Sequence, residues 1–121
     1  MKTLILVRHA ESESPKKMLQ DYERPLKKEG AIDAEKIGQY LKSNIYIPDY
    51  ILTSGAQRTL ETAQVIFQQL FDTLISIHEN RLIYGASVSE MKKLIKNFDN
   101  QYSAAMVIGH NPTITSLTNE I

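Results

Sequence analysis

The chain has 121 residues, of which 42% are apolar and 23% are charged, and its 14 basic residues balance its 14 acidic residues. This length suits a single globular domain, and the neutral total charge gives no electrostatic reason to expect nucleic acid or a membrane surface as a partner. The sequence contains no cysteine, which excludes a disulfide framework and a thiolate zinc site. Its apolar runs are too short to cross a bilayer and no signal peptide is recognisable, so we expect a cytoplasmic protein.

Four short apolar segments are typical of buried β-strands. They cover residues 3–8, 49–53, 74–78 and 104–109. The first segment shows no alternation of apolar and polar residues, which is the pattern of a strand covered on both faces.

Helical patterns separate the predicted strands. Apolar residues recur at helical spacing over residues 27–43 and form a wide apolar stripe over residues 57–71. Ser87 and Glu90 fit a capping box, in which side chain and backbone exchange hydrogen bonds at a helix start. They predict a third helix that begins directly after Ser87.

The order of these elements predicts the fold class. Asn111 followed by Pro112 is typical of an N-cap with proline at the first helical position, so a fourth helix is expected to begin at Thr113. The alternation of strands and helices predicts an α/β three-layer sandwich with a mostly parallel central sheet flanked by helices. Residues 11–26 are polar and contain Pro15 and Pro25, so they are expected to form a long loop of the kind that is often functional.

Residues that can bind an anion follow three of the four predicted strands. They are Arg8, His9, Ser54, Arg58 and His110. Ligands of open α/β sheets bind beyond the carboxyl ends of the strands. We therefore expect two arginines and two histidines to meet at one edge of the sheet.

The position of Arg58 favours a phosphate site. Ser54 to Gln57 fit a second capping box, which places Arg58 in the first helical turn, where a cation opposes the helix dipole at a cost of up to ~1 kcal/mol. A bound anion would reverse that effect, and arginine holds phosphate in a bidentate fork. One histidine can then attack phosphorus while the other stabilises the transition state. Because arginine and histidine supply the positive charge, no metal or other cofactor is expected.

Four motifs resemble those of the histidine phosphatase superfamily, which includes the cofactor-dependent phosphoglycerate mutases. "LVRHAESE" is similar to its Arg-His-Gly signature, "TSGAQRTLETA" to its Ser-Pro-x-x-Arg-x-x-x-Thr-Ala segment, and "VIGHNPTI" to its second-histidine motif. "DYERPLKKEG" is similar to the Arg-Pro-Leu-Thr-x-x-Gly stretch of the small SixA-type phosphohistidine phosphatases. The motifs occur in the family order over essentially the whole chain, which implies a phosphoglycerate mutase-like fold.

The resemblance implies a role for each of the residues that follow the strands. His9 would be the nucleophile, and His110 the second catalytic histidine. Arg8 and Arg58 would bind phosphate. Ser54 is expected to cap its helix and is a further candidate phosphate ligand.

Three positions depart from the family pattern. Ala10 stands in place of glycine and Gly55 in place of proline, whereas Tyr84 stands where many members carry a glutamate proton donor. Tyrosine, with a pKa of about 10, is a poor general acid at neutral pH. An imidazole leaving group needs less protonation than an alkoxide, so the missing acid favours phosphohistidine-like substrates. Glu11 and Glu79 remain open as alternative acids.

Three functions remain open from the sequence. The favoured one is a phosphatase that works through phosphohistidine at His9 on phosphohistidine in a protein. The second is a small-molecule phosphomonoesterase or phosphoglycerate mutase-like enzyme that uses Glu11 or Glu79 as its acid. The third is a phosphate-binding regulatory module without turnover. Asp21 and Arg24 are expected to pair and order the long loop, with a contact to substrate as the alternative.

The resemblance also raises a question about the domain. Residues 1–121 are expected to form a single histidine phosphatase domain that is lacking or shortened at its C-terminal end. The reason is that members of this branch continue for roughly 30–40 residues past the second-histidine helix, to about the usual domain size. We therefore hypothesise exposed apolar surface at the C-terminal helix, covered by further chain or by a second subunit in a homo-oligomer.

Overall fold

A parallel β-sheet lies at the centre of the computed structural model, which describes residues 3–16, 18–70, 76–98 and 102–121. Within these residues the sheet has four strands in the order β1-β4-β2-β3, and each neighbouring pair is parallel. The strands are β1 (Thr3–Arg8), β2 (Tyr50–Thr53), β3 (Ile77–Glu79) and β4 (Ala104–Gly109).

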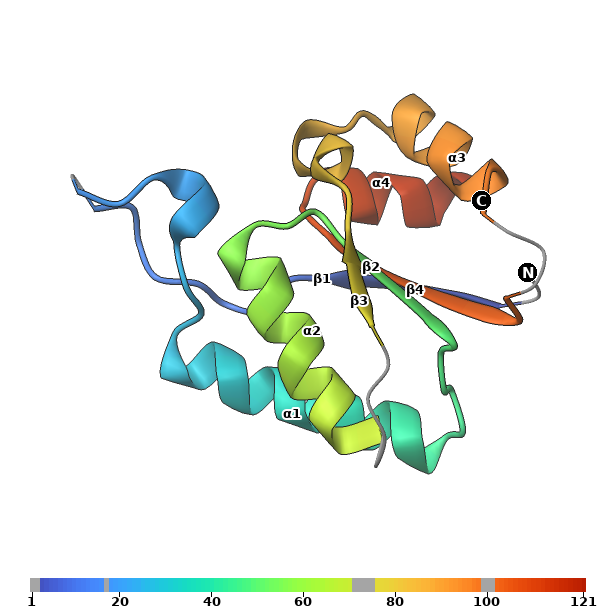
Figure 1. The fold of residues 1–121 in the computed structure, drawn as a ribbon, viewed down its shortest axis with the longest axis horizontal. Coiled ribbons are helices and arrows are strands. Elements are labelled where there is room, and N and C mark those ends of the chain that lie inside the picture. The colour runs from blue at the N-terminus through green and yellow to red at the C-terminus, as the bar shows by residue number, and fades with distance from the viewer. Residues whose placement is uncertain (1–2, 17, 71–75, 99–101) are drawn as a thin grey trace.

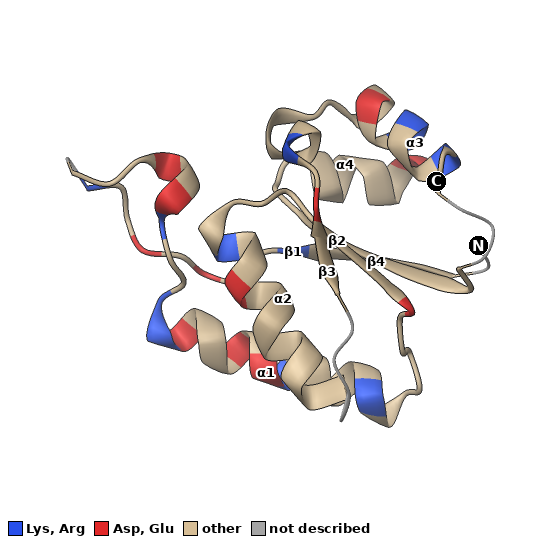
Figure 2. Ribbon diagram, viewed as in Figure 1, with Lys and Arg blue, Asp and Glu red and all other residues tan. Residues whose placement is uncertain are grey.

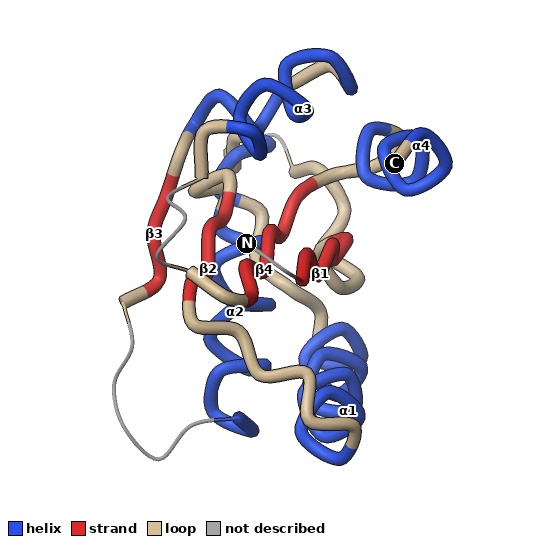
Figure 3. The backbone as a smooth tube through the Cα atoms, turned by 90° about the vertical axis from the view of Figure 1, so that its right-hand side faces the viewer, coloured by secondary structure: helices blue, strands red, loops and turns tan. Residues whose placement is uncertain are grey.

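Helices cover both faces of this sheet. They are α1 (Lys28–Ser43), α2 (Gln57–Leu70), α3 (Val88–Lys96) and α4 (Thr113–Glu120), together with the short 3-10 helices η1 (Asp21–Glu23) and η2 (Arg81–Gly85). Figure 1 and Figure 3 show α1 and α2 on one side of the sheet and α3 and α4 on the other. The predicted three-layer α/β sandwich is therefore confirmed. In the described part of the chain, no helix combines the length and apolarity needed to cross a membrane.

Two hydrophobic clusters explain why the strand sequences are apolar without alternation. Successive residues of a strand point to opposite faces. Ile51 belongs to the cluster beneath α1 and α2, whereas its neighbour Leu52 belongs to the cluster beneath α3 and α4. Met106 and Val107 divide between the same two clusters. Each such side chain contributes about 1.5–3 kcal/mol on burial, so both faces hold the sheet in place.

The third strand differs from its predicted range of 74–78. Residues 71–75, which include the expected last residue of the second helix, lie outside the described residues. The strand itself runs from Ile77 to Glu79, because these residues pair with β2 from Ile51 to Thr53. The end of β3 is therefore set by its pairing with β2, and the local sequence pattern holds no information about that pairing.

The predicted capping box of the third helix is confirmed. Ser87 Oγ accepts from the Glu90 amide at 3.1 Å, and Glu90 Oε1 accepts from the Ser87 amide at 3.0 Å. The fourth helix begins at Thr113, as predicted, but its N-cap is Pro112 and not the predicted Asn111, which precedes it. Asn111 Oδ1 still satisfies the helix start by accepting from the amide and the hydroxyl of Thr115.

The segment between β1 and α1 is more ordered than the predicted long loop. It contains η1 and projects from the sheet beside the start of α2 (Figure 1). Its base is tied by hydrogen bonds from the Glu13 amide to Pro25 and from the Lys27 amide to Glu11, each 2.9 Å. Gly30 in the first turn of α1 packs against this base, since a Cβ there would lie 2.1 Å from the Glu11 carbonyl oxygen.

The C-terminal helix is packed more fully than the sequence suggested. Ile114 and Leu117 of α4 are buried, and Leu117 joins the cluster beneath α3. The predicted exposed apolar surface at this helix is limited to Ile121, which is 65% exposed.

Candidate active site

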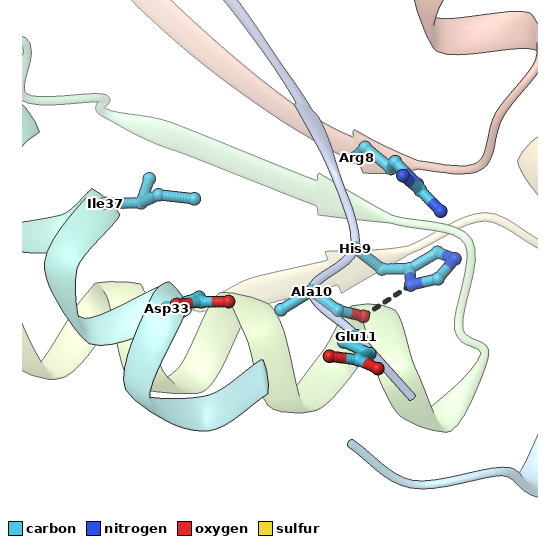
Figure 4. A pocket seen from close by; sticks show the side chains of 6 residues that line it. All are labelled: Arg8, His9, Ala10, Glu11, Asp33 and Ile37. Atoms are coloured by element: carbon cyan, nitrogen blue, oxygen red, sulfur yellow. Dashed lines mark hydrogen bonds between the residues drawn. The ribbon is translucent and has the colours of Figure 1, made fainter. Parts of the chain in front are cut away.

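His9 lies directly after β1, and its hydrogen bonding fixes which ring nitrogen carries the proton. Its Nδ1 lies 2.7 Å from the Ala10 carbonyl oxygen, and since a carbonyl only accepts, Nδ1 is the donor. Burial lowers the pKa of the imidazole, the Ala10 hydrogen bond raises it by less, and the positive charges of Arg58 and Arg8 lower it further. The neutral ring therefore presents its lone pair at Nε2. Figure 4 shows Arg8 and His9 projecting to the same side of the strand end.

His110 follows β4 and faces His9. The two ring centroids lie 5.3 Å apart with an interplanar angle of 56°. Burial, followed by the positive charge of Arg58, lowers the pKa of His110 to about 4. Two neutral imidazoles therefore stand side by side at the carboxyl edge of the sheet, where the sequence placed them.

Ser54 holds the second histidine. Its Oγ lies 2.7 Å from His110 Nε2 and 3.1 Å from Thr59 Oγ1, and it accepts from the Ala56 amide at 3.2 Å. Because the Thr59 hydroxyl donates to the Ala56 carbonyl, the Ser54 hydroxyl must donate to Thr59 and accept from His110 Nε2–H. This assignment leaves Nδ1 of the neutral His110 as the nitrogen with the lone pair.

The same contacts correct the predicted capping box at Ser54. The serine hydroxyl accepts from Ala56, two residues further on, and α2 begins at Gln57. Its one donor and two acceptor positions are filled by Thr59, Ala56 and His110. Direct contact of Ser54 with phosphate stays a prediction, and the geometry favours an action through His110.

Arg58 is the second residue of α2, in the first turn as predicted, and is only 5% exposed. Its Nη1 donates to the Asp21 carbonyl oxygen at 2.7 Å, and its Nη2 donates to Asp21 Oδ2 at 3.1 Å. The sequence predicted that a bound anion would balance the charge of Arg58, and the Asp21 carboxylate supplies part of that negative charge. Arg58 Nε is also buried, yet it has no hydrogen-bond partner among the described residues.

Asp21 is shared among three side chains. Its Oδ2 accepts from Arg58 and from the Tyr84 hydroxyl, and its Oδ1 accepts from Arg24 Nε at 2.9 Å. The Tyr84 hydroxyl, Arg24 and Arg58 together hold the pKa of this carboxyl far below its usual range. Arg24 also donates to the Glu13 carbonyl at 2.6 Å. The predicted pair of Asp21 and Arg24 is confirmed, and it orders the loop. Figure 2 shows the acidic η1 beside the basic first turn of α2.

Tyr84 lies in η2, at the position expected for a proton donor. Its ring meets His110 edge-on at 5.4 Å and 86°, and it meets Tyr22 edge-on at 5.0 Å and 88°. The hydrogen bond to Asp21 raises the pKa of the Tyr84 hydroxyl, and burial raises it further. The proton of Tyr84 is thus engaged with Asp21, and tyrosine does not replace the missing acid.

Glu11 follows His9 by two residues and forms an ion pair. Its Oε1 is 3.2 Å from Lys27 Nζ, an exposed ion pair. The residue lines a cavity of about 520 Å³ that Arg8, His9, Ala10, Asp33 and Ile37 also line (Figure 4). This cavity opens between the carboxyl end of β1 and α1, and neither His110 nor Arg58 lines it.

Glu79 closes β3 at the rim of the site. Its Cβ lies 3.8 Å from where a Cβ on Gly55 would stand, which places Glu79 beside the turn between β2 and α2. Gly55 has a φ of 86°, a conformation that proline, with its φ fixed near −65°, does not adopt. The departure from the family proline therefore follows from the shape of this turn.

Comparison with known proteins identifies the family. Residues 4–83 match the histidine phosphatase superfamily (branch 1). The chain belongs to the histidine phosphatase superfamily. Its structure is similar to that of a candidate phosphohistidine phosphatase SixA from Agrobacterium tumefaciens, with a TM-score of 0.89 and 30% identity over 99% of this chain and 77% of that one. The predicted SixA-like branch and phosphoglycerate mutase-like fold are therefore confirmed.

Other relatives are more distant or uncharacterised. The protein histidine phosphatase SixA in complex with tungstate shares the fold with a TM-score of 0.85 at 19% identity, covering 97% of this chain and 74% of that one. An uncharacterised chloroplastic protein of Arabidopsis thaliana is 33% identical over 116 residues, covering 89% of this chain and 53% of its own length. An uncharacterised protein of Mycobacterium tuberculosis is 29% identical, covering 92% and 66%. The chain thus spans between about half and two thirds of these curated relatives.

This histidine phosphatase fold brings the predicted residues together, and it adds some that sequence reasoning missed. His9, Ser54, Arg58 and His110 lie together at the strand ends, and Arg8 lies beside His9. Asp21 as a partner of Arg58, Thr59 as a partner of Ser54, and the Tyr22 ring beside Tyr84 were not anticipated. The position of Arg58 at a helix start predicted a nearby anion, but no sequence pattern identified Asp21, 37 positions earlier, as its partner.

Proposed function

We propose that this protein is a phosphatase that removes the phosphoryl group from phosphohistidine in a protein, through a phosphohistidine intermediate at His9. The observation that carries the proposal is the pairing of His9 Nδ1–H with the Ala10 carbonyl, which leaves Nε2 as a neutral nucleophile. The ring centroid of His110 lies 5.3 Å from that of His9, and the positive charge of Arg58 lowers the pKa of both histidines.

The phosphate-binding part of the proposal rests on an unpaired donor. A buried N–H without an acceptor costs about 1–3 kcal/mol, and within the part of the chain that the structure describes the Nε of Arg58 is such a group. A phosphate oxygen satisfies it and adds a charge-assisted hydrogen bond. Arg8, on the same side of β1 as His9, supplies the second guanidinium. A nearby phosphate dianion raises the pKa of His110, so that the protonated ring donates to the developing charge.

The reaction takes place in two displacements. In the first, His9 Nε2 forms a bond to phosphorus while the P–N bond of the substrate breaks, and the released imidazole takes up a proton from solvent water. In the second, a water oxygen bonds to phosphorus and the bond to His9 breaks, the water gives up one proton to solvent, and inorganic phosphate leaves. The cationic groups at the strand ends balance the charge on the phosphoryl oxygens, so we propose that no metal takes part.

The choice of phosphohistidine as substrate rests on the surroundings of the leaving group. The Tyr84 hydroxyl donates its hydrogen bond to Asp21 and has a raised pKa, and the Asp21 carboxyl stays ionised because its pKa is strongly lowered, so neither group is suited to protonate an alkoxide. Imidazole leaves a P–N bond with much less assistance. The similar structure from Agrobacterium tumefaciens is that of a candidate phosphohistidine phosphatase, which favours the same substrate class.

The test compares three substrates and follows His9 directly. We expect release of phosphate from a phosphohistidine peptide, and little or none from p-nitrophenyl phosphate or 3-phosphoglycerate. Acid-sensitive labelling at His9 should be visible by mass spectrometry and absent in His9→Ala. His78→Ala is the matched control, because this third histidine lies exposed on β3 and stacks on Tyr50 at 5.0 Å.

The position of Glu79 supports a second candidate. It lies beside the turn at Gly55 that leads into α2, whereas Glu11 lines a cavity with His9 but is paired with Lys27, so both carboxylates are candidate acids for a phosphomonoester. Equal turnover of p-nitrophenyl phosphate and phosphohistidine peptide, lost for the ester alone in Glu79→Gln, would favour a small-molecule phosphomonoesterase. Measurable phosphate affinity without labelling of His9 would instead favour a regulatory binding module.

A further inference from the structure

We propose that Asp21 is a positioning residue that sets the geometry of Arg58 for phosphoryl transfer, and this inference rests on the proposed function. Asp21 accepts hydrogen bonds from both terminal nitrogens of the Arg58 guanidinium. Its backbone carbonyl accepts from Nη1 at 2.7 Å, and its Oδ2 accepts from Nη2 at 3.1 Å. A single residue of η1 thereby fixes the plane and the direction of the fork. The one remaining nitrogen, Nε, is buried and unpartnered among the described residues.

The carboxylate is itself held from two further directions. Arg24 donates to Oδ1 from Nε at 2.9 Å and from Nη2 at 2.8 Å, and the Tyr84 hydroxyl donates to Oδ2. Arg24 is anchored in turn to the Glu13 carbonyl and to Ser12 Oγ. Asp21 is half exposed while Arg58 is buried, so the aspartate is fixed by its hydrogen bonds more than by packing. It joins the segment after His9, the start of α2 and η2 into one frame.

The negative charge of Asp21 allows a positioning role to be told apart from a direct effect on phosphate binding. A carboxylate repels a phosphate dianion, so removing Asp21 would strengthen phosphate binding if charge alone mattered. The same result would follow if Asp21 blocked Arg58 as an internal substitute for phosphate. A positioning role predicts the opposite, because a guanidinium that loses the Asp21 carboxylate keeps only the backbone carbonyl contact, which does not by itself fix its orientation toward the reacting phosphorus.

The experiment compares substitutions at one position. In Asp21→Ala we expect kcat on phosphohistidine peptide to fall on the order of 10–100-fold, the size of loss that a misplaced group produces. We expect a smaller change in KM and weaker binding of inorganic phosphate. Asp21→Asn keeps an acceptor oxygen for Arg58 without the charge, so it should recover much of the lost rate. Glu23→Ala, in the same 3-10 helix, is the control and should leave kcat unchanged.

A double substitution tests whether Asp21 acts through Arg58. In an Arg58→Ala background, Asp21→Ala should have no further effect on turnover or on phosphate binding, because residues that act as one unit are not additive. Additive losses would overturn the proposal. So would equal effects of Asp21→Ala and Asp21→Asn, or tighter phosphate binding in either. Circular dichroism melts establish that each variant is folded, and Asp21→Asn carries the test if Asp21→Ala does not fold.

Failure of this inference can be told from failure of the proposed function. A wild-type protein that turns over phosphohistidine and labels His9, with Asp21→Ala equally active, overturns only the positioning role. A wild-type protein without turnover or labelling overturns the proposed function. In that case the affinity for inorganic phosphate, measured by calorimetry for all variants, still decides whether Asp21 orients Arg58.

Discussion

The imidazole rings of His9 and His110 lie 5.3 Å apart, centroid to centroid, although they come from the ends of two different strands. β1 and β4 are neighbours in the sheet, and Arg8 pairs with Gly109 in their register, so the residue after each strand is carried to the same place. His9 donates its own amide to the Gly109 carbonyl at 3.1 Å, which extends that pairing into the site. The pair of rings is therefore a direct product of sheet order.

The first prediction concerns pH. The folded pKa of His110 is about 4 against 6.5 for the free side chain, and the pKa of His9 is also lowered. Between pH 6.5 and about 4 the unfolded chain therefore binds protons that the folded chain does not. The stabilisation by neutral histidines is complete above pH 6.5 and is lost as the pH falls, by about 1–2 kcal/mol after solvent screening is allowed for.

Urea unfolding at a series of pH values measures this effect, and NMR titration of the ring protons assigns it. Adding phosphate should raise the pKa of His110, because a dianion stabilises the imidazolium. The ionised Asp21 carboxylate stabilises the fold above its free pKa of 3.8, and that stabilisation is lost only as the pH falls below this value, so the two effects occupy separate pH ranges. A pKa of His110 near 6.5 in the phosphate-free protein would contradict the prediction.

The second prediction concerns Ser54. Ser54→Ala removes the acceptor of His110 Nε2–H, so the ring loses its fixed tautomer and orientation. We expect kcat to fall roughly 10-fold, since such supporting contacts are typically worth 10–100-fold, and the ¹⁵N shifts of His110 to report mixed tautomers.

Ser87→Ala provides the comparison. It removes the N-cap of α3 and should lower the free energy of unfolding by about 1 kcal/mol. Turnover per folded molecule should remain unchanged, because α3 contributes none of the site residues. Equal activity of Ser54→Ala and wild type would show that His110 needs no such partner.

The third prediction concerns Gly30. A Cβ at this position would stand 2.1 Å from the Glu11 carbonyl oxygen, which is backbone and cannot rotate away. Gly30→Ala should therefore destabilise the fold by about 1–3 kcal/mol, the range for overpacking, and displace the segment that follows His9. Gly85→Ala is the control, since a Cβ there meets nothing within 4 Å. Thermal melts and phosphate affinity of both variants check this, and equal melting temperatures would contradict it.

The fourth prediction concerns Ile45. This residue follows α1 with a φ of 60°, a left-handed conformation that is unfavourable for a β-branched side chain, and it is 82% exposed. The conformation ends the helix, because the Tyr46 amide bonds to the Leu41 carbonyl at 2.9 Å. Ile45→Gly should raise the free energy of unfolding by about 0.5–1 kcal/mol.

Ile45→Ala separates the two possible causes. It removes the exposed apolar group but keeps a Cβ, so it should gain less than Ile45→Gly in urea unfolding. Equal gains from both substitutions would mean that exposure of the isoleucine, and not its backbone conformation, is the unfavourable feature.

Several elements could be predicted because their causes are local. The unbroken apolar run of β1, the stripe of α2 and the capping box of Ser87 and Glu90 each depend on residues within a few positions. Arg8, His9, Arg58 and His110 could be placed together for a related reason, since strand ends in a parallel sheet share one edge. The end of β3 and the contacts of Ser54 could not, because they depend on β2 and on His110.

The sequence by itself determined that strands and helices alternate, that arginines and histidines able to bind an anion follow the strands, and that Tyr84 stands where many family members carry a glutamate proton donor. Only the tertiary structure decided which nitrogen of each histidine carries its proton and which side chain holds Arg58. Those choices depend on acceptors such as the Ala10 carbonyl, Ser54 and Asp21 lying within about 3 Å. Hydrogen bonds form at that range and depend on direction, so they arise only once remote segments have been packed against one another.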